Sequence, residues 1–140
     1  MKSKKMLIGL AIAILIIPVL TACGPTKVDA ALTTYKITLD KDSAPAGDII
    51  FHVHNDATDL THEFVIFKTD LAPDSLPTKD DGTVDEEGQG VTHIDEVELE
   101  PGASQDLTVN LDSGNYVLIC NIDSSEMHYA HGMHVAFTVK

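Results

Sequence analysis

The stretch Tyr116–Val139, YVLICNIDSSEMHYAHGMHVAFTV, contains two short apolar segments joined by a polar loop. The segments Tyr116–Cys120 and His134–Val139 are rich in Val, Ile, Leu, Phe and Tyr, which is typical of β-strands. Cys120 and the loop that follows it bring a thiol, imidazoles and thioethers together in a short length of chain. The stretch therefore predicts a strand, loop and strand unit that carries soft metal ligands.

The rest of the chain repeats the strand pattern, with turn-forming residues between the segments. Five further candidate strands are Tyr35–Leu39, Ile49–His54, Glu63–Lys68, His93–Leu99 and Leu107–Leu111. No long amphipathic helix accompanies them, so we expect an all-β fold, an antiparallel Greek-key β-sandwich or barrel of about seven to eight strands. Residues 69–90 are rich in Asp, Glu, Pro and Gly and lack the spacing of a calcium-binding loop, which predicts an exposed acidic loop.

The N-terminus has the pattern of a secretory signal. Lysines at the start precede an apolar run over residues 6–20, which is too short to span a bilayer, and small residues follow it. The position of Cys23 after Leu-Thr-Ala resembles a bacterial lipoprotein signal, which implies a lipid on Cys23 and an extracytoplasmic protein anchored to a bacterial membrane, at the cell surface or on the periplasmic face. The expected organisation is a signal peptide over 1–22, lipidated Cys23 and a tether over 23–34, and a β domain over 35–140.

The chain is strongly acidic. It carries 22 acidic residues against 9 lysines, with a formal net charge of −13. Three of those lysines lie in residues 1–22, so cleavage there would leave 6 − 22 = −16. A negative field of this size disfavours nucleic acid as a partner and predicts a protein partner with a basic docking surface.

The ligand types point to copper. If Cys23 is acylated, Cys120 has no partner cysteine in an oxidising compartment, and a bound metal would protect it. A thiolate and two imidazoles with a weak thioether favour copper in a trigonal arrangement with a long axial Met. A second imidazole can come from His62, at the start of a distant strand. Met127 as the axial ligand and His131 in place of His128 remain open at this point.

Three blocks of the sequence, THEFVIFKTDLAPDSLP, YVLICN and HYAHGMHVAFTV, resemble the cupredoxin family, in particular small plastocyanin-like and azurin-like blue copper proteins. The resemblance runs from about Tyr35 to the end. It implies one type 1 copper and single-electron transfer by a carrier that is not an enzyme. The ligands that it implies are His62, Cys120, His128 and Met133. Their neighbours Glu63 and Asn121 are expected to orient the ligands and tune the sulfur.

The chain departs from the family pattern after Cys120-Asn121, where residues 123–127 lengthen the loop and Met127 precedes His128. The spacing of His128 and Met133 favours His128 over His131. The extra thioethers and imidazoles also leave an alternative function open, which is the binding or delivery of Cu(I) or Cu(II) for assembly of a copper enzyme.

Overall fold

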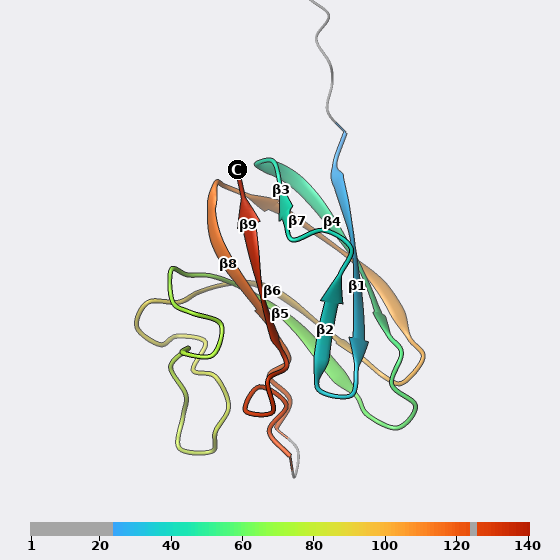
Figure 1. Ribbon diagram of the computed structural model, residues 1–140, viewed down its shortest axis with the longest axis vertical. Coiled ribbons are helices and arrows are strands. Elements are labelled where there is room, and N and C mark those ends of the chain that lie inside the picture. Colours follow the sequence, from blue (N-terminus) through green and yellow to red (C-terminus); the bar gives the residue numbers. More distant parts are fainter. Residues whose placement is uncertain (1–23, 124–125) are drawn as a thin grey trace, which may run out of the picture.

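The computed structural model describes residues 24–123 and 126–140, so the predicted signal peptide and Cys23 lie outside the described residues. The described part contains nine strands and no helix, and therefore no helix that could cross a membrane (Figure 1). The strands are β1 (Thr26–Thr33), β2 (Lys36–Leu39), β3 (Ser43–Ala44), β4 (Gly47–Asn55), β5 (His62–Lys68), β6 (Thr92–Leu99), β7 (Ser104–Leu111), β8 (Gly114–Ile119) and β9 (His134–Val139).

The strands form a two-layer sandwich. One sheet has the order β2-β1-β4-β7 and the other has the order β3-β9-β8-β5-β6. The predicted sandwich is confirmed, whereas the alternative of a closed barrel is wrong. The expected antiparallel pairing holds for most neighbours, but β1 pairs with β4 and β3 pairs with β9 in parallel. Each sheet contributes aromatic rings to the core, where Phe51 lies 5.5 Å from Phe64 and 5.3 Å from Phe137 between ring centroids.

The tether predicted for residues 23–34 is wrong over Thr26–Thr33, because these residues form β1 in the middle of a sheet. Val28, Ala30 and Leu32 alternate with more exposed residues, and all three side chains are completely buried. The alternation has the period of two expected of a strand. Alanine is depleted in strands, which is why this segment lacks the composition that marks the others.

The acidic loop over residues 69–90 is irregular, as predicted, but part of it is buried. Leu76 and Val84 pack with Phe67, Val117 and Tyr129 in a second apolar cluster. The Tyr129 hydroxyl accepts a hydrogen bond from the Leu76 N–H at 3.0 Å. The loop therefore covers the outer side of β5 and β8, and the buried pattern of β5 on both faces follows from this.

The histidines of β4, His52 and His54, lie outside both apolar clusters. His52 contacts Asp106 at 2.5 Å, and His54 contacts Asp56 at 3.2 Å, while Phe51 and Val53, which alternate with the two histidines, are buried. Both histidines therefore lie on the face of β4 that is turned away from the core.

Candidate metal centre

Three predicted ligands from separate parts of the chain meet at one pole of the sandwich. His62 opens β5, Cys120 directly follows β8, and His128 lies in the loop before β9. β5 and β8 are antiparallel neighbours, with Val65 opposite Ile119, so the start of β5 lies beside the end of β8. This pairing brings His62 to Cys120 although they are distant in sequence.

The ligand atoms of these side chains converge. His62 Nδ1 lies 3.1 Å from His128 Nδ1, and Cys120 Sγ lies 3.7 Å from His62 Nδ1 and 3.3 Å from His128 Nδ1. All three side chains are buried. Two imidazole nitrogens and a sulfur at such distances form the three corners of a site that one cation can occupy.

Met133 lies next to this triad. Its side chain is completely buried in the same core cluster as Cys120. The Cys120 N–H donates to the Met133 carbonyl at 3.0 Å, and the Met133 N–H donates to the His128 carbonyl at 3.1 Å. Backbone hydrogen bonds thus fix the position of Met133 relative to two of the three other residues.

Burial controls the protonation of the site. Desolvation, followed by the neighbouring His128, lowers the pKa of His62 to about 4. Desolvation, followed by His131, also lowers the pKa of His128. Both imidazoles are therefore neutral near pH 7, the form that binds metals. His62 Nε2 is buried and has no hydrogen-bond partner among the described residues, so Nδ1 carries the polar contacts of this ring.

The thiol needs a cation to ionise. Burial raises the pKa of Cys120 to about 11, although backbone N–H groups of Glu63 and Ile122 oppose the shift. The Glu63 N–H lies 3.2 Å from Cys120 Sγ. A coordinated thiol is deprotonated outright, so a soft cation at this position would convert the group to a thiolate that accepts these N–H bonds.

The rival ligands lie elsewhere. Met127 packs against Gly82, with its Cγ 3.3 Å from the position that a Cβ of that residue would take. His131 is half exposed, stacks on Tyr35 at 4.7 Å between ring centroids, and lies 3.9 Å from Glu126. Neither Met127 nor His131 is brought to Cys120 in the way that Met133 and His128 are.

Tyr35 covers the metal centre. Its ring meets His128 edge-on at 5.2 Å between centroids, and its hydroxyl donates a hydrogen bond to the Glu126 carboxylate. His128 is only 1% exposed beneath this ring, so a docking partner would not reach the imidazole directly. Tyr35 has a left-handed φ of 54° in the turn between β1 and β2. Nothing in the amino-acid sequence predicts its contact with His128.

The two neighbours of the ligands act differently from one another. Glu63 contacts Cys120 through its backbone N–H. Asn121 binds the acidic loop, because its Oδ1 accepts the Val84 N–H at 2.7 Å and its Nδ2 donates to Glu86 Oε1 at 3.0 Å. The residue after Cys120 thus fixes the loop against the metal centre.

A β-sandwich with this ligand group at one pole is the blue copper electron-transfer fold of the cupredoxins, and the His, Cys, His and Met side chains fit one type 1 copper. The chain is similar to solved structures of this fold. It is 26% identical to a reduced auracyanin from Roseiflexus castenholzii, with a TM-score of 0.60, over 84% of this chain and 99% of that one. The resemblance predicted from sequence is confirmed.

Two further similar structures agree in fold. Rusticyanin from Thiobacillus ferrooxidans is 18% identical over 84% of this chain and 79% of that chain, with a TM-score of 0.60. Auracyanin A, described as a "blue" copper protein from Chloroflexus aurantiacus, is 16% identical over 84% of this chain and 100% of that chain, with a TM-score of 0.55. No family model and no curated protein sequence matches the chain.

Proposed function

We propose that this protein is an extracytoplasmic type 1 copper protein that carries single electrons between redox partners and is held to a bacterial membrane by a lipid on Cys23. Copper would be bound by His62, Cys120, His128 and Met133. The observation that carries the proposal is the convergence of His62 Nδ1, Cys120 Sγ and His128 Nδ1, all within 3.7 Å of one another in a buried site.

Copper held by one thiolate and two imidazoles supplies a one-electron couple between Cu(II) and Cu(I). The residues of this chain would hold its ligands on strand ends and exclude water, since His62, Cys120 and Met133 are completely buried. Buried ligands leave little access for a substrate, which supports a carrier and not an enzyme. The N–H groups directed at Cys120 Sγ would stabilise the thiolate and tune the reduction potential.

The position of the N-terminus supports the anchored arrangement. β1 begins at Thr26, close to Cys23 in sequence, and this end of β1 lies at the pole opposite the turn between β1 and β2, the turn that contains Tyr35 (Figure 1). A lipid on Cys23 would therefore leave the copper pole directed away from the membrane. The strong negative charge supports a partner with a basic docking surface.

Copper delivery is the second candidate, because Met127 and the half-exposed His131 offer soft or borderline ligands beyond the four that a type 1 site needs. In a delivery protein, Cu(I) would pass rapidly to an acceptor protein lacking copper. The complete burial of Cys120 and Met133 favours the carrier, since exchange of the metal would require this pole to open.

The test is a Cu(II) titration of residues 24–140, followed by visible absorption. We expect intense charge transfer between thiolate and copper that saturates at one equivalent and is lost in Cys120→Ser. Copper bound without that band would contradict the proposed site. Cys23→Ala in the full chain should move the protein from the membrane fraction to the soluble fraction, and unchanged fractionation would contradict the lipid anchor.

A further inference from the structure

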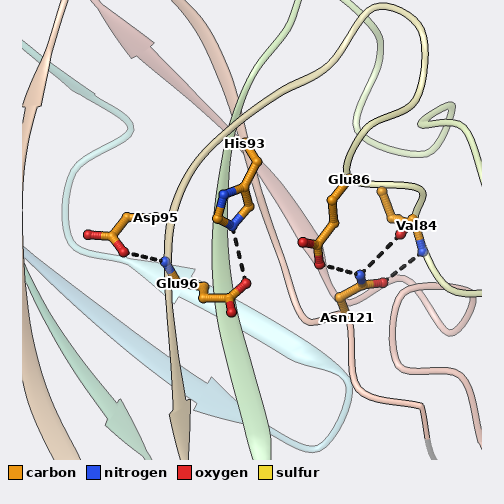
Figure 2. Close-up of polar contacts among 6 residues, drawn as sticks. All are labelled: Val84, Glu86, His93, Asp95, Glu96 and Asn121. Carbon is orange, nitrogen blue, oxygen red and sulfur yellow. Dashed lines mark hydrogen bonds and ion pairs between the residues drawn. The ribbon is translucent and has the colours of Figure 1, made fainter.

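A β-bulge in β6 brings two potential ligands to one face of the sheet. Ile66 is opposite Asp95 and Phe67 is opposite His93, so Ile94 between them is an extra residue. In a regular strand, residues three apart point to opposite faces. The bulge removes that alternation, and His93 Nε2 lies 3.1 Å from Glu96 Oε2 (Figure 2). Bulges commonly re-aim side chains near functional sites.

A third ligand reaches the same place from the acidic loop. The Asn121 side chain holds this part of the loop through both Val84 and the Glu86 carboxylate (Figure 2). One ligand atom from each of Glu86, His93 and Glu96 lies within 4.8 Å of the others. The imidazole of His93 is in turn placed by the Phe67 ring, 5.7 Å away between centroids. Three side chains from a strand and a loop are thus prepositioned around one point.

Carboxylates around this cluster repel one another, and a bound cation would reduce that repulsion. Glu63 and Glu98 are directly opposite each other on β5 and β6, where like charges are destabilising. Glu86 and Glu96 add two further carboxylates to the surroundings of Glu63. A divalent cation bound by Glu86 and Glu96 would offset this repulsion.

We propose that Glu86, His93 and Glu96 form a second metal site, distinct from the copper centre, that binds a divalent transition-metal cation of the Zn²⁺ type. One imidazole and two carboxylates are nitrogen and oxygen ligands with no sulfur, which suits Zn²⁺ and disfavours Cu(I). Metal–ligand distances of about 2.0–2.2 Å require ligand atoms roughly 3.5 Å apart in a tetrahedral site. Small rotations of the two carboxylates, of which Glu96 is exposed and Glu86 half-buried, would achieve this, and water would complete the coordination.

The test is a calorimetric titration of the copper-loaded protein with Zn²⁺. We expect one equivalent to bind, with affinity more than about tenfold weaker in His93→Gln and in Glu86→Gln, a loss usual even for the outer partners of metal ligands. His52→Gln is the matched control, because His52 contacts a single carboxylate, Asp106, on the other sheet. Its affinity should equal that of the wild type.

X-ray absorption at the zinc edge identifies the ligands. A shell of nitrogen and oxygen alone supports the site, whereas a Zn–S distance of about 2.3 Å would place zinc at Cys120 and overturn the proposal. Equal affinity of the wild type and His93→Gln would overturn it as well. The same difference between these two proteins is expected in a Cys120→Ser background, so the result does not depend on copper binding.

Discussion

Asn55 is predicted to hold together the part of the fold that delivers His62. It ends β4 and is only 1% exposed. Its Nδ2 donates to the carbonyls of Leu60 at 2.8 Å and Leu99 at 2.9 Å, and its Oδ1 accepts the Ala57 N–H at 3.0 Å. These three hydrogen bonds fix the loop between β4 and β5, which leads directly to the first proposed copper ligand.

Asn55→Ala removes all three bonds and leaves two carbonyls and one N–H to find new partners. At about 1 kcal/mol of net stabilisation for each bond, the free energy of unfolding should fall by about 3 kcal/mol. Urea unfolding of the copper-free protein measures this. Asn110→Ala is the control, because Asn110 makes one exposed bond to Asp48 and should cost less than about 1 kcal/mol. A loss at Asn55 no larger than that of the control would refute the reasoning.

Three further changes test the copper centre and its surroundings. Burial, followed by nearby carboxylates, raises the pKa of Glu63 to about 7 in the folded protein, so stability present at low pH is lost as the pH rises through about 7. Glu63→Gln should therefore raise the free energy of unfolding of the copper-free protein by roughly 1–2 kcal/mol more at pH 8 than at pH 5, after solvent screening. Urea unfolding measures this, and an equal effect of the substitution at both pH values would contradict it. Met133→Leu should keep the visible band but raise the reduction potential, because Cu(II) loses a ligand; voltammetry showing an unchanged potential would count against an axial Met133. Tyr35→Ala should expose His128 and speed reduction by a small soluble reductant in stopped-flow absorption, and an unchanged rate would show that Tyr35 does not shield the metal.

The strands that could be predicted from sequence are those whose composition and alternation agree. β5 and β9 carry Val, Ile, Phe or Thr at successive positions, and both were expected within one residue of their observed bounds. β1 is not predictable in this way, because its buried positions include Ala30, and alanine is depleted in strands. The two-residue β3 is too short to have a period at all.

The ligand group was predictable because each residue lies at a strand end or shortly before the next strand. Chemistry and the family resemblance then favoured His128 and Met133 over their rivals. The cluster of Glu86, His93 and Glu96 was not predictable, because the register of β6 changes at Ile94 and the sequence carries no mark of the bulge. The sequence of loop 69–90 predicts full exposure for a related reason: its two buried apolar residues are scattered among acids and do not follow a period.

The contacts of Tyr35 give a structural reason for the lengthened loop after Asn121. Glu126, within the inserted segment, accepts the Tyr35 hydroxyl, and Tyr35 in turn packs on both His128 and the neighbouring His131. The insertion therefore does not open the site to solvent, because it supplies the anchor for an aromatic cover over the proposed ligand His128. A redox partner at this pole would meet Tyr35 and the half-exposed His131 before it could approach the His128 ring. The rate of electron exchange would then depend on how closely the partner packs on these two rings. The choice of partner at this pole would depend on the shape and charge of Tyr35 and His131 more than on the identity of the proposed ligand His128.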